Sequence, residues 1–166
     1  MTGDNMIEWL WSTIWKFRCF TTINKTFTLH FRRTDYIRYS KEKYDLKPFK
    51  KSYFSDGMDY YNEEFGDDVV FLWISDDMEW GKKKFKNRKD IVFTDTGNKT
   101  TDEAIGYDLA LLARSDHTII TRGTFGMWAA ILCGGEYYGP YGPIVPVHIL
   151  DERQTKGKKK KKNRKH

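Results

Sequence analysis

The stretch DLALLARSDHTIITRGTFGMWAA, residues 108–130, decides the fold class because its hydrophobic period changes twice over a short distance. Its first part continues a pattern in which Ile105, Leu109, Leu112 and Ala113 fall on one face of a helix. The segments that follow are a strand at 117–121, a tight turn at Arg122-Gly123, and an apolar helix at 124–133 that two glycines end. A helix that leads into a strand, and a strand that turns into a helix, are typical of α/β architecture.

The alternation of strands and helices continues on the amino-terminal side of this stretch. Residues 27–31 alternate apolar and polar side chains, as in a strand, and 69–74 form a continuous apolar run typical of a strand buried on both faces. Three further helices are predicted: 52–65, 77–86 with Asp76 and Glu79 as a capping box, and one that starts at Thr100 with Glu103 and ends at 115. A strand at 91–94 and a last apolar piece at 147–150 complete the pattern. This order predicts a parallel sheet of about four or five strands with helices on both faces.

Charge is divided unevenly along the chain. The net charge is +6, but residues 151–166 contain nine Lys or Arg against two carboxylates, whereas residues 1–150 contain 20 basic and 21 acidic side chains. The folded part is close to neutral, so we expect no nucleic-acid partner, and a nucleic-acid-binding protein driven by the tail is the disfavoured alternative. We predict a poorly defined segment at 1–26, in which 7–15 has the spacing of a short amphipathic helix, one α/β domain at 27–150, and a disordered lysine-rich tail at 151–166.

The sequence gives only weak information on the cellular compartment, from its cysteines, its hydropathy and its glycosylation sequons. Cys19 and Cys133 do not have the spacing of a metal site, and we expect two buried free thiols, with one disulfide bridge as the alternative. No stretch approaches the roughly 18 consecutive apolar residues of a membrane-spanning helix. Asn24 and Asn98 begin Asn-x-Thr sequons, which would be glycosylated only in a secretory lumen.

Polar residues follow three of the predicted strands. In a parallel sheet, ligands bind beyond the carboxyl ends of the strands, often at helix N-termini. This rule selects residues 32–35, 75–77 and 121–124 as candidate site segments.

Arg32 and Arg33 are the first candidates for a ligand-binding role. A guanidinium group binds two phosphate oxygens at once and keeps its charge, so the pair suits a diphosphate. Because strand alternation sends the two side chains to opposite sides, we expect one to contact phosphate while the other orders the loop through Asp35. A surface Arg–Asp pair that caps the strand is the alternative interpretation.

The segment from Thr121 to Phe125 is the second candidate. A strand, a turn with glycine and a threonine that opens a helix present backbone N–H groups and hydroxyls to an anion. The alternative is that Thr124 is merely the N-cap of the helix. Trp128 lies on the same apolar helix and is predicted to belong to the core.

Three ordered segments resemble the galactoside alpha-1,2-fucosyltransferases. They are His30-x-Arg32-Arg33-x-Asp35-Tyr36, which is similar to the donor-binding motif of that family, the segment FLWISDDMEW at 71–80, and the opening stretch 108–130. The resemblance implies a Rossmann-like, nucleotide-sugar-binding domain at 27–150, one lobe of a GT-B-type glycosyltransferase. It also implies an inverting, metal-independent reaction that moves fucose from GDP-fucose to a galactose-terminated glycan, with no cofactor. The sequence contains no Asp-x-Asp, the carboxylate pair that usually holds a divalent metal against a sugar diphosphate.

The resemblance also assigns roles to individual residues. Arg32, Arg33 and Asp35 become the catalytic candidates, with the two arginines at the GDP phosphates and Asp35 ordering an arginine or the fucose. The resemblance implies further donor contacts from His30, Asp108, Thr121, Thr124 and Phe125. Structural alternatives stay open for two of them: a satisfied core histidine for His30 and an exposed helical carboxylate for Asp108. As a partner of Arg33, Asp35 is expected to have a low pKa and to be a feeble base.

Length separates this chain from the family it resembles. Family members carry a membrane anchor, a stem and a first lobe before the arginine motif, whereas 29 residues precede His30 here. The resemblance implies the luminal side of the Golgi membrane, with membrane attachment only through an N-terminal anchor that is missing here. The alternative is a truncated remnant that keeps the nucleotide-binding fold, binds GDP-fucose weakly and transfers fucose poorly or not at all.

Overall fold

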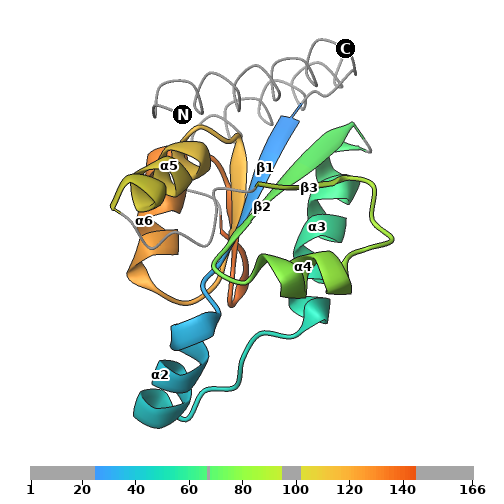
Figure 1. Cartoon of the computed structure of the whole chain (residues 1–166). Coiled ribbons are helices and arrows are strands. Elements are labelled where there is room, and N and C mark those ends of the chain that lie inside the picture. Colours follow the sequence, from blue (N-terminus) through green and yellow to red (C-terminus); the bar gives the residue numbers. More distant parts are fainter. Residues whose placement is uncertain (1–24, 67, 95–101, 145–166) are drawn as a thin grey trace, which may run out of the picture.

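The computed structural model describes residues 25–66, 68–94 and 102–144, which form a layered α/β domain (Figure 1). The described strands make one sheet in the order β3-β2-β1-β4-β5-β6, in which the last pair is antiparallel and all other pairs are parallel. The strands are β1 (Lys25–Phe31), β2 (Val69–Ser75), β3 (Ile91–Phe93), β4 (His117–Ile120), β5 (Tyr137–Gly139) and β6 (Gly142–Ile144). The predicted Rossmann-like parallel sheet is confirmed, with an antiparallel strand added at its edge.

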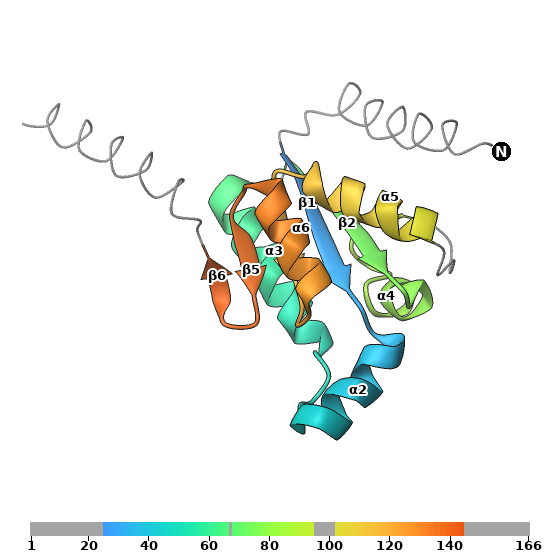
Figure 2. The same cartoon turned by 90° about the vertical axis from the view of Figure 1, so that its left-hand side faces the viewer.

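Helices cover both faces of the sheet. Those that the structure describes are α2 (Thr34–Tyr44), α3 (Lys51–Phe65), α4 (Met78–Lys84), α5 (Asp102–Ala113) and α6 (Thr124–Cys133). The side chains of α3 pack with one cluster of buried residues, and those of α5 and α6 pack with the other. Figures 1 and 2 show α3 and α4 on one face, α5 and α6 on the other, and α2 beyond the end of β1.

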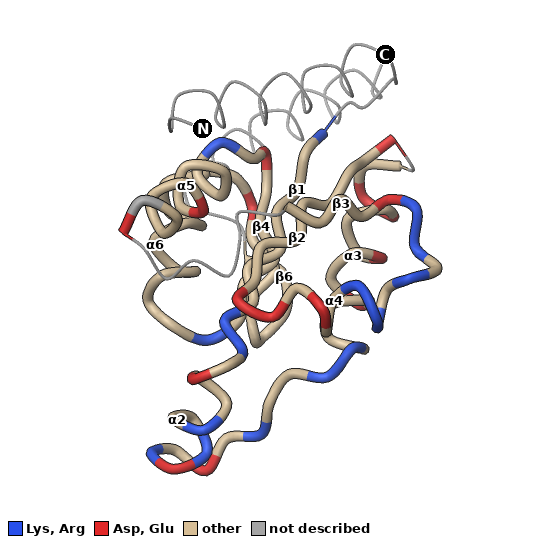
Figure 3. The backbone as a smooth tube through the Cα atoms, viewed as in Figure 1, with Lys and Arg blue, Asp and Glu red and all other residues tan. Residues whose placement is uncertain are grey.

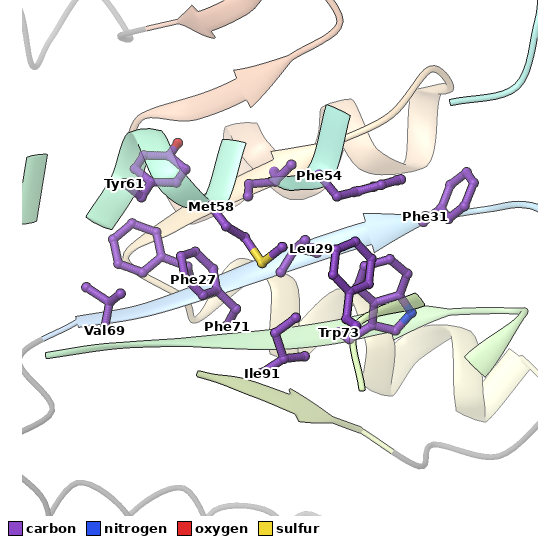
Figure 4. Close-up of a cluster of buried hydrophobic side chains, with 12 residues drawn as sticks. Phe27, Leu29, Phe31, Phe54, Met58, Tyr61, Val69, Phe71, Trp73 and Ile91 are labelled. Atoms are coloured by element: carbon purple, nitrogen blue, oxygen red, sulfur yellow. The ribbon is translucent and has the colours of Figure 1, made fainter. Parts of the chain in front are cut away.

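The larger core lies between the sheet and α3. Alternate residues of β1, from Phe27 to Phe31, point into it together with Phe71 and Trp73 of β2, as Figure 4 shows. Their rings meet Phe54 of α3 at centroid distances of 4.8 Å from Phe31 and 5.2 Å from Trp73. Aromatic rings bury large areas and hold defined geometries, so this core fixes β1 and the direction in which it ends.

The opposite core is smaller and leaves much of α6 uncovered. It contains Ile74, Leu111, Leu112 and Ala129, all buried. The prediction that Trp128 belongs to the core was wrong, because its side chain lies on the outer face of α6 and is 58% exposed. An apolar helix need not be buried all round, and only the face that carries Ala129 and Ala130 packs inward.

Two described elements were not predicted. Helix α2 begins directly after the two arginines, where we expected a loop, and its C-cap is Asp45, which adopts the left-handed conformation with φ 49°. The β5–β6 hairpin lies in a Gly- and Pro-rich stretch for which we predicted no strand. The sheet therefore has six strands where about four or five were expected.

Several sequence predictions lie outside the described residues: the helix at 7–15, Cys19, the sequons at Asn24 and Asn98, the helix start at Thr100, the apolar piece at 147–150 and the tail at 151–166. Cys133 is described; its thiol is half-buried, not fully buried, and donates to the backbone oxygen of Ser115 at 3.1 Å. Among the described helices, none is both long enough and apolar enough to cross a membrane.

Candidate functional site

The two main candidate segments meet where the strand order of the sheet reverses. Strands β1 and β4 are neighbours, with His30 opposite Ile120, so the residues after each strand leave the same edge of the sheet at the same level. From β1 the chain connects toward β2 and β3, and from β4 it connects away toward β5. In open α/β sheets this reversal opens a crevice at the carboxyl ends of the strands, where ligands bind.

A small pocket, open to solvent, lies at this reversal point. Its walls come from the end of β1, α2, the link from α2 to α3 and the end of β4; the lining residues are Phe31, Arg32, Tyr36, Ile37, Ser40, Lys47, Pro48, Phe49, Thr121 and Arg122. Three of these are basic and none is acidic. Figure 3 shows the basic stretches after β1 and before α6 at the same end of the sheet. A pocket with this charge favours an anionic ligand.

Arg32 reaches the pocket and is held by a nearby carboxylate. Its guanidinium donates to both oxygens of Asp35, at 2.9 Å from Nε and 2.5 Å from Nη2. Both side chains remain more than half exposed, so a ligand can approach this arginine. We expected Asp35 to pair with Arg33, and this was wrong, because α2 begins at Thr34 and places Asp35 one helical turn from Arg32. The hydrogen bond from Arg32 lowers the pKa of Asp35, in line with the expected feeble base.

Arg33 points to the other side and is enclosed by the segment after β2. Its Nη1 lies 2.5 Å from Asp77 Oδ2, and its guanidinium lies 5.2 Å from the ring centre of Trp80. A carboxylate partner and a cation–π contact both hold this side chain in place. The two side chains therefore lie on opposite sides, as predicted: Arg32 lines the pocket and pairs with Asp35, and Arg33 pairs with Asp77. A phosphate contact of Arg32 stays a prediction.

Asp76 fastens the turn that carries both arginines. Its carboxylate accepts from the backbone N–H of Arg33 at 2.7 Å and of Thr34 at 3.0 Å, and from the Thr34 hydroxyl. We call these contacts the Asp76 clamp. Since N–H groups at the start of α2 have no partner within the helix, the clamp does for α2 what an N-cap side chain normally does.

The start of α4 also differs from its prediction, because Asp76 is bound to the turn before α2. Asp77, not Asp76, is the N-cap, and its Oδ1 accepts from the backbone N–H of Trp80 at 3.0 Å. Asp76 is engaged by the clamp and is not available as the cap. Sequence spacing favoured Asp76 because the capping-box pattern considers only local partners.

The turn between β4 and α6 forms the opposite wall of the pocket. Gly123 is the N-cap of α6 with φ 123°, a conformation that favours glycine, and Thr124 is the exposed first helical residue. The alternative that Thr124 caps the helix was therefore wrong. Thr121 is buried, and its hydroxyl donates to the backbone oxygen of His30 at 3.4 Å, which ties the turn to β1.

His30 and Phe125 lie on the α6 side of β1. Their ring centres are 4.9 Å apart, and His30 is buried. Burial lowers the pKa of His30 to about 4, so the ring is neutral at physiological pH. This packing is that of the structural histidine left open as the alternative, and neither ring lines the pocket.

Asp108 is the remaining sequence candidate. It lies half-buried on α5, on the face of the sheet that also carries α6, and is not among the residues that line the pocket. Within the described part of the chain, no group of three or more His, Cys, Asp or Glu side chains is arranged to hold a metal ion.

Sequence reasoning missed Lys47 as a pocket residue, and it gave no role to Tyr36 and Arg122, although both stand in segments that it selected. Arg122 Nη1 donates to the backbone oxygen of Lys47 at 3.1 Å, and its guanidinium lies 4.4 Å from the ring centre of Phe49. The basic residue in the turn after β4 was the available signal for Arg122. Lys47 carried no signal, because the path of the link from α2 to α3 brings it to the pocket.

Comparisons with known proteins agree with this arrangement. The model of glycosyl transferase family 11 matches residues 15–163. Galactoside alpha-(1,2)-fucosyltransferase 1 of Sus scrofa is 36% identical over 109 residues, which cover 65% of this chain and 29% of that protein. Galactoside 2-alpha-L-fucosyltransferase Sec1 of Mus musculus is 35% identical over 126 residues, which cover 74% of this chain and 33% of that protein. The chain thus spans about a third of the length of these curated relatives.

A solved structure shares the fold. The alpha-1,6-fucosyltransferase NodZ, co-crystallized with GDP, superposes with a TM-score of 0.54 at 13% identity, over 87% of this chain and 46% of that one. A second NodZ structure, from Bradyrhizobium, gives a TM-score of 0.53 at 12% identity. With a family model that matches most of its length, and an α/β domain whose motif arginines stand at the reversal point of the sheet, this chain belongs to glycosyl transferase family 11.

Proposed function

We propose that this chain is the donor-binding part of a galactoside alpha-1,2-fucosyltransferase, which transfers fucose from GDP-fucose to the terminal galactose of a glycan. One observation carries the proposal: Arg32, Lys47 and Arg122 line a single pocket at the reversal point of a nucleotide-binding type of sheet. Family membership and the names of the relatives supply the sugar and the acceptor.

Arg32 is the proposed contact for the diphosphate. In an inverting transfer, the galactose O2 bonds to fucose C1 on the face opposite to the diphosphate. The C1–O bond to the β-phosphate breaks with its electron pair staying on GDP, and the hydroxyl proton passes to a base. Negative charge therefore grows on the leaving phosphate, and a fixed guanidinium stabilises the transition state more than the ground state.

Other groups of the pocket edge support the same charge. The free N–H groups in the first turn of α6 and the exposed hydroxyl of Thr124 stand at the N-terminal end of a helix, where anions are favoured. Asp35 serves to orient Arg32 and is not the base in this scheme, because its lowered pKa makes it a poor proton acceptor. Asp108 and His30 are left with supporting roles, since neither lines the pocket.

The proposed reaction needs neither metal nor cofactor. Arg32, Lys47 and Arg122 together with the α6 N-terminus supply the positive charge that a divalent ion provides in metal-dependent transferases. The proposed setting is the luminal side of the Golgi membrane, as the resemblance to these transferases implies.

A titration with GDP in a buffer containing EDTA tests the donor site. We expect binding without added metal, and we expect Arg32→Ala to raise the Kd by about 10- to 100-fold, the loss of one charge-assisted bidentate contact of about 1.5–3 kcal/mol. Arg38→Ala is the matched control, because its side chain on α2 is 84% exposed and outside the pocket lining. Equal affinities for the two variants, or binding that requires Mg²⁺, would contradict the proposal.

Turnover separates a transferase from an inactive remnant. Orientation of the acceptor supplies up to ~7–11 kcal/mol of rate acceleration in favourable cases, and two-lobed transferases place the acceptor between their lobes. Fucose transfer to lactose at a rate that Arg32→Ala abolishes supports the enzyme. Tight GDP binding with no transfer supports the remnant.

A further inference from the structure

We propose that three tyrosines of α2, Tyr36, Tyr39 and Tyr44, form the binding surface for a neutral, galactose-terminated glycan. We call them the tyrosine row. This inference rests on the proposed function, and adds to it the place where the acceptor lies. Arg32 pairs with Asp35 and Arg33 with Asp77, and these tyrosines take no part in either ion pair. The inference about the tyrosine row can therefore be wrong while the proposed donor site is right.

The tyrosine row is a connected set of rings on one helix. The ring centres of Tyr36 and Tyr39 are 5.7 Å apart, and those of Tyr39 and Tyr44 are 5.9 Å apart. The rings meet at 38° and 77°, so they make a stepped surface and not a flat one. Tyr36 and Tyr39 are neighbours on the helix because residues three and four apart share a face.

Two members of the row are open to solvent. Tyr39 is 44% exposed and Tyr44 is 53% exposed, whereas most rings of the domain lie in the core beside α3. Adjacent exposed aromatic side chains are enriched at binding sites, where they offer large contact area at a low entropic cost. Figures 1 and 2 show α2 standing beyond the edge of the sheet, apart from the helical layers.

The row begins at the donor pocket. Tyr36 lines the pocket together with Arg32 and Thr121. Its ring also stands next to the turn before α6, where a Cβ built on Gly123 would lie 3.8 Å from it. A sugar that receives fucose must sit beside the diphosphate, and a glycan attached to it must leave the pocket along some surface. From Tyr36, the row leads out of the pocket and along α2.

The chemistry of the row matches an uncharged sugar chain. A pyranose presents a face of C–H groups, which carry partial positive charge and pack against the electron-rich face of an aromatic ring. Its hydroxyls need polar partners at the rim, and Lys43 supplies one: its ammonium donates to the Tyr39 hydroxyl at 3.2 Å and lies 5.3 Å and 5.6 Å from the ring centres of Tyr39 and Tyr44. Galactose has one such apolar face, which makes it a suitable first residue against Tyr36.

A titration with a galactose-terminated tetrasaccharide in the presence of saturating GDP tests the tyrosine row, with saturation-transfer NMR as the readout. We expect Tyr39→Ala and Tyr44→Ala each to raise the glycan Kd by about three- to tenfold, the loss of one ring contact. Tyr39→Phe and Tyr44→Phe keep the ring and should keep most of the affinity. Tyr141→Ala is the matched control, because this tyrosine lies in the β5–β6 turn and is 96% exposed.

The outcomes distinguish this inference from the proposed function. If GDP binds to every variant, and the tetrasaccharide either fails to bind the unmodified chain or binds the Ala variants with unchanged affinity, the tyrosine row is overturned and the donor site stands. If GDP fails to bind the unmodified chain, the proposed function fails first. An unchanged GDP affinity in each variant also establishes that the variant is folded.

Discussion

The adjacent arginines of the motif have different physical roles because their partners differ. Arg32 pairs with Asp35, and both side chains are more than half exposed at the pocket. Arg33 is instead held by Asp77 and by the ring of Trp80. A ligand can replace solvent around Arg32 without breaking the fold. Around Arg33 it would have to displace contacts that join β1 to the segment after β2.

Two buried histidines make the stability of the domain depend on pH. Burial lowers the pKa of both His30 and His117 to about 4, below the value of roughly 6.5 expected in the unfolded chain. Between about pH 6.5 and pH 4 the unfolded chain therefore binds more protons than the folded one, so the free energy of unfolding falls as the pH falls through this window. Urea unfolding followed by tryptophan fluorescence should show a decreasing midpoint.

A matched variant identifies the source of that decrease. His117 Nδ1 accepts from the backbone N–H of Glu136 at 3.0 Å, and His117→Asn keeps an acceptor but removes the titrating ring. The variant should lose part of the pH dependence between about pH 6.5 and pH 4. A midpoint that stays constant in the unmodified chain across this window would contradict the prediction.

At the scale of elements, the Asp76 clamp joins the starts of two helices. It satisfies N–H groups of the turn before α2, while the neighbouring Asp77 caps α4. We predict that Asp76→Ala lowers the free energy of unfolding by about 1–2 kcal/mol through the loss of charge-assisted hydrogen bonds. Because the same turn positions Arg32, the GDP Kd should also rise.

Two companion variants control for this effect. Glu79→Ala removes a carboxylate that is 84% exposed and pairs with Lys82 across one turn, so neither stability nor GDP binding should change measurably. Asp76→Asn keeps one acceptor oxygen and should fall between the two. If chemical denaturation and calorimetry give Asp76→Ala the same values as Glu79→Ala, the clamp does not position the arginine turn.

The elements that the sequence predicts correctly are those whose own residues determine them. The apolar run of β2, the alternation in β1 and the apolar helix α6 each carry a period that tertiary contacts reinforce. Helix α2 was missed because its sequence, TDYIRYSKEKY, is largely polar and buries only Ser40 fully. Its start depends on Asp76, which is 42 residues away from Thr34.

The candidate site was predictable in position but not in pairing. A rule about strand ends identified Arg32 and Thr121 correctly as pocket neighbours, because parallel strands end at one edge of the sheet. The partners of the arginines were not predictable, since Asp77 reaches Arg33 only when β1 and β2 pair in register. Local spacing suggested the wrong aspartate in both places.

For the whole molecule, the outer face of α6 is the feature that most affects behaviour in solution. Met127, Trp128, Ile131 and Leu132 are all about half exposed on this helix. A patch of this kind favours association. We predict that the chain self-associates as its concentration rises, and that Trp128→Lys with Ile131→Glu reduces this, as measured by sedimentation velocity.

The control for this prediction is again a remote exposed ring. Tyr141→Lys changes a 96% exposed side chain outside α6 and should leave the sedimentation profile as it is. GDP affinity should be equal in both variants, because none of these residues lines the pocket. A chain that stays monomeric at high concentration would show that the α6 face does not drive association.

The pairing of β1 with β4 also decides when the pocket comes into existence. One wall comes from residues 31–49 and the other from residues 121 and 122, although the two strands that carry them are adjacent. A nascent chain has completed β1, α2, α3 and β2 long before the second wall of the pocket exists. Ligand binding at this pocket therefore requires that β4 has paired with β1, which closes a loop of most of the domain. A ligand that contacts both walls would stabilise this pairing, because it binds the folded domain and not the unfolded chain.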